Sequence, residues 1–260
     1  LRRAAAASHP VVFHARRNIE MAQALLLKSL GAKTLRILFT SSAQRHHSRF
    51  TRWLMAQMHC VISTCTAAAS YLTVPPYQLI PHGIDTKRFV PRDPGLPPKR
   101  HVFAATHQIC ILGRVRHQKG VDILIEAAIP LLKTQPEWGI LVVGEIKKED
   151  AVFVQRLKDE LDREGLLGRV KFTGLQPFAT LPAYFRHADI VTALSRNEGY
   201  GLTVLEAMGS GTAVLASMAG AWPDIVQHEQ NGLLVPIDDV EATRTALSAL
   251  MLDPELRARL

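Results

Sequence analysis

Short apolar runs alternate along most of the chain with longer segments in which apolar residues recur every three or four positions. The short runs predict buried strands, and the periodic segments predict amphipathic helices. In the segment 121–132, for example, Val121, Leu124, Ile125 and Ala128 fall on one helical face. Because strands and helices alternate, we expect parallel sheets and therefore an α/β fold.

A proline-rich, polar stretch at 91–100 is typical of a linker between domains. We therefore predict a first domain over 1–95 and a second over 96–260. The predicted strands are 10–14, 35–40, 60–64, 78–81, 109–112, 140–145, 170–175, 188–194, 212–216 and 232–235. The predicted helices are 19–30, 48–58, 67–72, 121–132, 151–164, 181–187, 202–208 and 239–250.

The charge of the chain is unevenly distributed. Residues 1–84 contain ten Lys and Arg and one acid, Glu20, a net charge of +9, whereas the remainder contains 21 Lys and Arg against 22 Asp and Glu, a net charge of −1. The basic part predicts a partner such as an acidic substrate or anionic lipid head groups. Nucleic acid is disfavoured because aromatic residues are sparse there and form no RNA-binding pattern.

Three cysteines, Cys60, Cys65 and Cys110, form no paired framework and have no metal-finger spacing, so we expect a reducing, cytoplasmic compartment. Two histidines, His46 and His47, precede Cys60 and Cys65 at irregular spacing, which disfavours a metal site. No window holds eighteen consecutive apolar residues, and no signal peptide is visible. The chain begins with Leu1 rather than Met, so we expect a fragment.

The stretch 195–211 has the clearest chemical pattern. It follows the apolar run 188–194 and leads through a loop with Gly199 and Gly201 into the predicted helix 202–208. Free N–H groups and the positive end of the helix dipole suit a phosphate there. Two carboxylates, Glu198 and Glu206, bracket the loop with seven residues between them. One acid could face a sugar and the other a ribose diol.

A second loop with cations follows the strand 109–112. Gly113 and Arg114 come directly after the strand, and Lys119 lies five residues further on. Ligands of parallel sheets bind beyond the carboxyl ends of strands, where two cations can neutralise a diphosphate. His14 ends an earlier strand and is therefore a candidate base or substrate contact.

The stretch 198–206 resembles the E-x7-E motif of retaining glycosyltransferases of family 4, which have the GT-B fold of two Rossmann-like domains. The loop 113–120 resembles the G-R and K-G elements of the same family. This resemblance implies that Glu206 binds ribose hydroxyls, that Glu198 contacts the transferred sugar, and that the diphosphate is bound without a metal or other cofactor. It assigns donor binding to Gly113, Arg114, Lys119, Gly199, Tyr200, Gly201, Leu202 and Glu206.

Other segments resemble the same family less completely. Residues 80–91 resemble its N-G-V-D-x-x-x-F-x-P segment, with His82 where Asn is commoner. Residues 219–226 resemble its G-G-x-x-E element, with Asp224 in place of Glu, which leaves a role for Asp224 open. The resemblance also implies that Leu175 and Gln176 border the nucleotide base, and that the first domain is partial, because its opening glycine-rich loop is not visible.

The sequences His-Ala-Arg-Arg at 14–17 and Gln-Arg-His-His-x-Arg-Phe at 44–50 are similar to those of bacterial lipopolysaccharide core mannosyltransferases. This similarity implies transfer of mannose from GDP-mannose to a Kdo–lipid A core, at the cytoplasmic face of an anionic membrane. The acceptor would contact Arg16, Arg17, Arg45 and His46, and His14 would act in catalysis with Glu198. Two alternatives remain open: a family 4 enzyme that uses a UDP-sugar on another glycan, and an inactive fragment that binds anions only.

Overall fold

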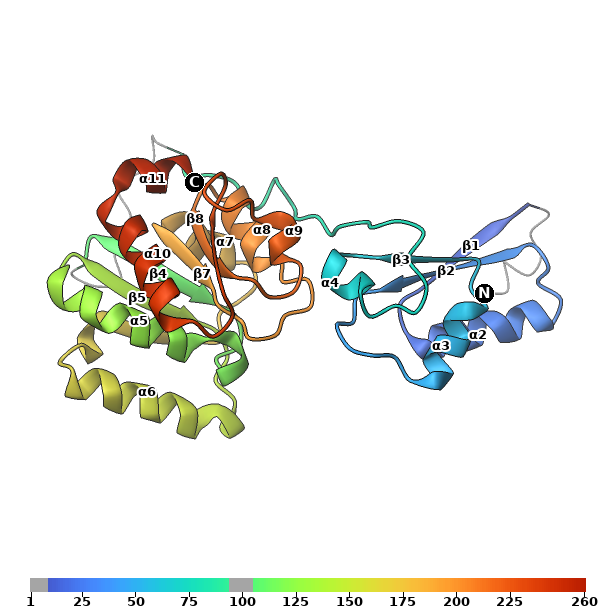
Figure 1. Cartoon of the computed structure of the whole chain (residues 1–260), viewed down its shortest axis with the longest axis horizontal. Coiled ribbons are helices and arrows are strands. Elements are labelled where there is room, and N and C mark those ends of the chain that lie inside the picture. Colours follow the sequence, from blue (N-terminus) through green and yellow to red (C-terminus); the bar gives the residue numbers. More distant parts are fainter. Residues whose placement is uncertain (1–8, 94–104) are drawn as a thin grey trace. The chain divides into compact units, whose positions relative to one another are not determined.

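The computed structural model describes residues 9–93 and 105–260. The chain separates into two compact units, one ending at His82 and the other beginning at Gly83. The predicted boundary between residues 95 and 96 lies outside the described residues. Each unit is built on its own parallel sheet, as Figure 1 shows.

The first unit has a three-stranded parallel sheet in the order β1-β2-β3. Its strands are β1 (Val11–Ala15), β2 (Leu35–Ser41) and β3 (Cys60–Ser63), and its helices are α2 (Asn18–Ser29), α3 (Arg49–Ala56) and α4 (Thr66–Ala69). Apolar side chains of the sheet, such as Ile37 and Phe39, pack against α2 and α3. The strand predicted at 78–81 is wrong: Leu79 makes only an isolated bridge with Ser63. Pro81 lacks the N–H group that would continue the pairing.

The second unit has a six-stranded parallel sheet in the order β6-β5-β4-β7-β8-β9. Its strands are β4 (His107–Leu112), β5 (Trp138–Val143), β6 (Val170–Gly174), β7 (Ile190–Ala193), β8 (Ala213–Ser217) and β9 (Leu233–Val235). Strand β4 pairs with β5 on one side and β7 on the other, so the winding of the chain reverses between β4 and β7. In sheets of this kind the ligand crevice lies at that reversal, beyond the carboxyl ends of the strands.

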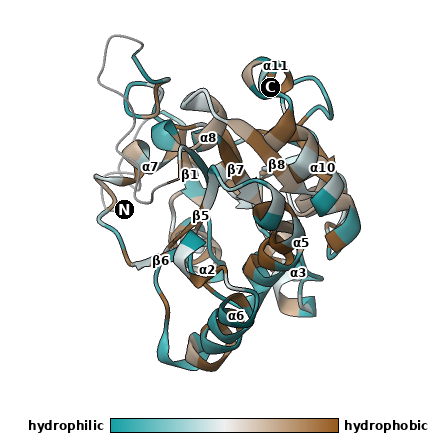
Figure 2. Cartoon of the chain, turned by 90° about the vertical axis from the view of Figure 1, so that its left-hand side faces the viewer, coloured by the Kyte–Doolittle hydropathy of each residue, from teal (hydrophilic) through white to brown (hydrophobic). Residues whose placement is uncertain are grey.

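Helices cover both faces of the second sheet. They are α5 (Val121–Thr134), α6 (Ala151–Arg163), α7 (Leu181–His187), α8 (Thr203–Gly209), α9 (Trp222–Ile225), α10 (Val240–Leu252) and α11 (Pro254–Arg259), with 3₁₀ turns η1 (His117–Lys119), η2 (Lys148–Asp150) and η3 (Leu167–Arg169). Along β4, Ile109 and Ile111 enter one core, whereas Cys110 and Leu112 enter the other. This alternation is the two-residue period of a strand buried on both faces. In Figure 2, β7 and β8 are accordingly brown, while α6 presents many teal residues.

The segment that follows His82 is fixed to the second unit. Phe89 is buried and packs edge-on against Phe185, with ring centroids 5.6 Å apart. Asp85 accepts a hydrogen bond from the backbone N–H of Lys87 (2.9 Å), which closes the turn before Phe89. Within the described part of the chain, none of the helices is both long and apolar enough to cross a bilayer.

Candidate active site

The loop after β4 starts the site at the carboxyl edge of the second sheet. Gly113 has a φ of +132°, and its carbonyl oxygen would lie only 1.8 Å from a Cβ atom placed on Gly144, the residue after β5. Gly120, just before α5, has a φ of +68°, and a Cβ atom placed on it would lie 2.0 Å from the carbonyl oxygen of Leu194 after β7. These contacts leave no room for a side chain at Gly120 or Gly144, and they show that the loops after β4, β5 and β7 approach each other closely.

Lys119 and Glu198 form an ion pair across the reversal point of the sheet. Lys119 comes from the turn η1 after β4, and Glu198 from the loop after β7. Their side chains are only 22% and 15% exposed. The Glu198 carboxylate also accepts hydrogen bonds from the Ser195 hydroxyl and the Gly199 N–H, both at 3.2 Å. The two residues predicted to contact diphosphate and sugar therefore lie in direct contact with each other.

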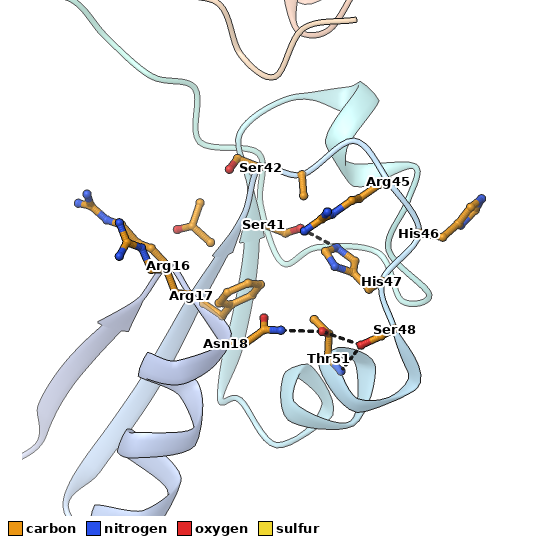
Figure 3. A pocket seen from close by; sticks show the side chains of 13 residues that line it. Arg16, Arg17, Asn18, Ser41, Ser42, Arg45, His46, His47, Ser48 and Thr51 are labelled. Carbon is orange, nitrogen blue, oxygen red and sulfur yellow. Dashed lines mark hydrogen bonds between the residues drawn. The ribbon is translucent and has the colours of Figure 1, made fainter. Parts of the chain in front are cut away.

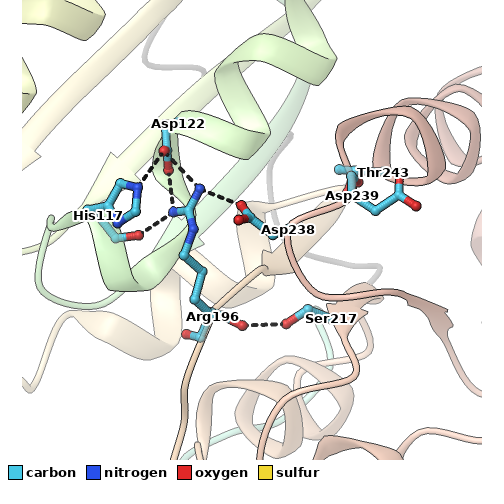
Figure 4. A network of polar contacts seen from close by, with 8 residues as sticks. His117, Asp122, Arg196, Ser217, Asp238, Asp239 and Thr243 are labelled. Atoms are coloured by element: carbon cyan, nitrogen blue, oxygen red, sulfur yellow. Dashed lines mark hydrogen bonds and ion pairs between the residues drawn. The ribbon is translucent and has the colours of Figure 1, made fainter.

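A network of polar contacts around Arg196, drawn in Figure 4, fixes the loop just before Glu198. Arg196 donates to both carboxylate oxygens of Asp122 at the start of α5 (2.9 and 3.0 Å), and pairs with Asp238 at 2.6 Å. Burial alone would lower the pKa of Arg196, but its hydrogen bonds to the two carboxylates outweigh burial and raise it. The Ser217 hydroxyl donates to the Ser195 carbonyl at 2.7 Å.

The glycines of this loop meet α9 and the turn before it. The Trp222 indole N–H donates to the Gly201 carbonyl at 2.9 Å, and Gly201 has a φ of +73°. A Cβ atom on Gly220 would lie 2.7 Å from the carbonyl oxygens of Glu198 and Gly199. The loop is thus enclosed by backbone on one side and by the buried Trp222 on the other. Tyr200 is buried within it, and Leu202 precedes α8 at the exposed side.

Glu206 lies one turn into α8 and lines a cavity of about 280 Å³. The cavity is also lined by Gly113, Arg114, Leu175 and Gln176. Burial raises the pKa of the Glu206 carboxyl, and the nearby Arg88 guanidinium offsets part of that increase. The candidates for ribose and base and one diphosphate candidate, Arg114, thus border one cavity. Lys119 lines a neighbouring small pocket that shares Gly113 and Thr203 with it.

Arg114 is held by two acids that were not singled out in the sequence. Its guanidinium donates to Glu149 (2.6 Å) and to Asp150 (2.9 and 3.2 Å), both on the turn η2 after β5. These hydrogen bonds raise the pKa of Arg114, and the one that Arg114 donates to Asp150 has the larger effect. The two acidic partners of Arg114 follow β5, the strand paired with β4, and the Arg114 side chain lines the Glu206 cavity.

Three arginines and two histidines of the first unit border a cavity of about 600 Å³, drawn in Figure 3. Arg16 and Arg17 come from the junction of β1 and α2, and Arg45 and His46 from the loop after β2. His46 also packs edge-on against Tyr71, with centroids 5.2 Å apart. All four residues predicted to contact the acceptor therefore line one cavity.

Two further histidines lie near this cavity. His47 lines it and contacts the Ser41 hydroxyl at 3.2 Å. Burial, followed by the charges of Arg45 and His46, lowers the pKa of His47. His14 lies in a neighbouring cavity of about 440 Å³ that it shares with Arg16, and its ring contacts the Thr40 hydroxyl at 2.6 Å. Among the described residues, no three His, Cys, Asp or Glu side chains gather as a metal site requires.

Residues 98–260 match the family described as "Glycosyl transferases group 1". The chain belongs to this family. It is 40% identical over 253 residues to the lipopolysaccharide core biosynthesis mannosyltransferase LpcC of Rhizobium leguminosarum bv. viciae, covering 94% of the chain and 69% of that protein. It is also 40% identical to the lipopolysaccharide core biosynthesis mannosyltransferase LpsB of Rhizobium meliloti, covering 95% of the chain and 71% of that protein.

Solved structures of other glycosyltransferases have the same fold. The C-terminal domain of a group 1 glycosyl transferase (LpcC) from Francisella tularensis is 35% identical, with a TM-score of 0.64 over 68% of this chain and 92% of that one. Anabaena HepE, solved with UDP, is 21% identical, with a TM-score of 0.81 over 95% of this chain and 71% of that one. The α/β fold of two Rossmann-like units, in the GT-B class, is confirmed.

Within this glycosyltransferase, several supporting residues were not predicted from the sequence. Arg196, Asp122 and Asp238 are far apart in the chain, and only the reversal of the sheet brings them together. Glu149 and Asp150 follow β5, the strand beside the one that precedes Arg114, so neighbouring strand ends could have suggested them. Asp224 is exposed on α9, and its role stays open.

Proposed function

We propose that this glycosyltransferase transfers mannose, with retention, from GDP-mannose to the Kdo–lipid A inner core of lipopolysaccharide. The observation that supports it best is the Lys119–Glu198 ion pair at the reversal point of the second sheet, where the pocket lined by Lys119 shares Gly113 and Thr203 with the Glu206 cavity. The choice of mannose and of a lipopolysaccharide core follows two relatives that carry those words in their names, each 40% identical.

Donor binding would exchange the partners of Lys119. In the structure the Lys119 ammonium pairs with the Glu198 carboxylate. A diphosphate at the strand ends would pair with Lys119 and Arg114. The Glu198 carboxylate would then be released to accept hydrogen bonds from sugar hydroxyls. Glu206 would accept hydrogen bonds from the ribose hydroxyls, and Leu175 and Gln176 would border the base.

The transfer step needs no group beyond donor, acceptor and these side chains. The bond between the anomeric carbon and the diphosphate oxygen breaks while a bond to the acceptor oxygen forms on the same face of the sugar. The proton of the acceptor hydroxyl passes to the departing phosphate oxygen. Lys119 and Arg114 would stabilise the charge that develops on the diphosphate as it leaves.

The acceptor would bind to the first unit. Kdo carries a carboxylate and lipid A carries phosphates, and these anions suit the cavity lined by Arg16, Arg17 and Arg45. His46 would contact the acceptor from the rim, and His14 would position or polarise the acceptor or the sugar. Because such an acceptor is held in a bilayer, we also propose that the chain contacts an anionic membrane surface from the cytoplasmic side.

Calorimetric titration of GDP, UDP and GDP-mannose tests the donor site. We expect GDP to bind and Lys119→Ala and Glu206→Ala each to weaken it about 10- to 100-fold, since hydrogen bonds to charged groups contribute about 1.5–3 kcal/mol. Lys171→Ala and Glu255→Ala, at exposed positions of the same unit, serve as matched controls. Preferential UDP binding would overturn the choice of guanine, and no nucleotide binding would overturn the donor site.

Glu198 separates binding from transfer. We expect Glu198→Gln to bind GDP at least as tightly as the unaltered chain, because Lys119 no longer has to leave a carboxylate. Transfer of mannose to Kdo–lipid A should be about 10²–10³-fold slower, as expected when one electrostatic contact to a transition state is lost. The product can be measured by mass spectrometry, and its anomeric configuration by NMR. Unchanged transfer by this variant would remove Glu198 from the reaction.

A further inference from the structure

Helix α3 of the first unit exposes a pair of aromatic side chains. Phe50 and Trp53 are 60% and 56% exposed, and their rings stack with centroids 6.1 Å apart and an angle of 21°. The opposite face of the helix is buried through Thr51, Leu54 and Met55. The aromatic pair therefore faces outward because the helix is already fixed to the unit by its other side.

Arginines flank this pair, and no acid lies on the helix. Arg49 and Arg52 are exposed, as Phe50 and Trp53 are, and lie three residues apart on the helix, so the two arginines share the exposed face with the rings. Glu20 is the single acid among residues 1–84. An anionic lipid surface complements this arrangement, because arginines bind phosphate groups and aromatic side chains such as Trp and Phe enter the head-group region. A protein partner of this face would need a matching acidic surface around an apolar pocket.

The same helix forms part of the wall of the arginine-lined cavity. Ser48 caps α3 by accepting a hydrogen bond from the Thr51 N–H (3.2 Å), and both residues line the cavity, as labelled in Figure 3. Arg45 lines it from the loop just before the helix. An anionic head group bound in the cavity would thus lie beside α3. The outer face of α3 would then meet the bilayer that anchors the lipid of that head group.

We propose that the exposed face of α3 docks on an anionic lipid bilayer, with Phe50 and Trp53 entering the head-group region and Arg49 and Arg52 contacting lipid phosphates. This surface deepens the proposed membrane contact, on which it rests, and it is independent of which sugar is transferred. An eight-residue helix with two aromatic rings gives weak, reversible binding that depends on salt concentration.

Tryptophan fluorescence tests the proposal directly. The chain has three tryptophans, all in the described residues, and both Trp138 and Trp222 are only 1% exposed. A change caused by vesicles therefore reports on Trp53. With vesicles of phosphatidylglycerol and phosphatidylcholine, we expect a blue shift and quenching by brominated acyl chains. Pure phosphatidylcholine vesicles should give neither, and high salt should reverse both.

Vesicle co-sedimentation measures the contribution of each side chain. We expect Phe50→Ala with Trp53→Ala to weaken binding at least tenfold, and Arg49→Gln with Arg52→Gln about 10- to 30-fold. Tyr77→Ala, at another exposed aromatic residue of the first unit, is the matched control and should bind like the unaltered chain. GDP binding should be the same in all these variants, which separates a failure of this surface from a failure of the donor site.

Three results would overturn the proposal: equal binding to neutral and anionic vesicles, no fluorescence change at Trp53, or unchanged binding by both double variants. Circular dichroism of each variant checks that it is folded. The four side chains are exposed, so their replacement should leave the unfolding temperature within a few degrees of the unaltered value.

Discussion

At the scale of single residues, Glu206 links donor binding to pH. Burial raises the pKa of its carboxyl above the ordinary value of 4.5, and Arg88 only partly offsets this. The carboxylate proposed to bind ribose hydroxyls therefore lies in a site that favours its neutral form. The folded chain binds the Glu206 proton more tightly than the unfolded chain does. Protonation of Glu206 therefore stabilises the fold below the pKa of this carboxyl in the unfolded chain, and this stabilisation is lost as pH rises through its pKa in the folded chain.

Glu206→Gln should therefore raise the free energy of unfolding at pH 7 relative to the unaltered chain, and this advantage should shrink toward pH 4.5. GDP affinity should fall about 10- to 100-fold in the same variant, a gain in stability at the expense of binding. Urea unfolding at both pH values measures the first effect. Glu255→Gln, at an exposed site, should show no such pH-dependent difference. An equal effect of Glu206→Gln at both pH values would contradict the prediction.

Residue patterns indicated which side chains to consider but not their partners. Glu198 and Lys119 were singled out separately, because each follows an apolar strand, and their direct pairing depends on the adjacency of β4 and β7. The acids that hold Arg114 were missed for a similar reason. Charged residues are common in loops, and only the sheet order decides which loops meet.

At the scale of elements, the strands and helices with strong apolar patterns were predicted to within a few residues, and α7 (Leu181–His187) has the predicted bounds. The helices α9 and α11 were not predicted, because α9 has only four residues and α11 is mostly polar. The wrong strand at 78–81 has two apolar residues beside Pro81, too few to form a ladder. Strand order could not be read from the sequence, since it depends on packing between distant segments.

Close backbone contact between loops is the element-scale feature that holds the site together, and Gly144→Ala tests it. Its Cβ atom would lie 1.8 Å from the Gly113 carbonyl oxygen, a backbone atom that cannot rotate away. We expect a loss of at least about 1–3 kcal/mol in the free energy of unfolding, together with weaker GDP binding, because the loop of Arg114 must shift. Gly168→Ala, which meets nothing within 4 Å, should change stability by about 0.5 kcal/mol or less. Similar stability of the two variants would contradict this explanation.

At the scale of the whole molecule, the two units divide the proposed work. The first unit holds the arginine-lined cavity and the aromatic face of α3. The second unit holds the residues proposed to bind the nucleotide-sugar donor. The uneven charge of the sequence reflects this division, because the basic part coincides with the unit proposed to meet anions. The E-x7-E stretch and the cationic loop both belong to the second unit, in which two apolar clusters pack against a six-stranded sheet.

Two units with separate cores should unfold in two steps, and a donor nucleotide should stabilise one of them. GDP at 100 times its Kd stabilises the unit that binds it by about 2.7 kcal/mol. For a unit of this size, we expect the midpoint temperature of the transition that belongs to residues 83–260 to rise by about 5–10 °C. The midpoint temperature of the other transition should not change. Scanning calorimetry with and without GDP measures both, and at the same GDP concentration Lys119→Ala should reduce the shift to about half or less. A single transition that moves as a whole would mean that the units unfold together, because cooperative unfolding requires their cores to be energetically coupled.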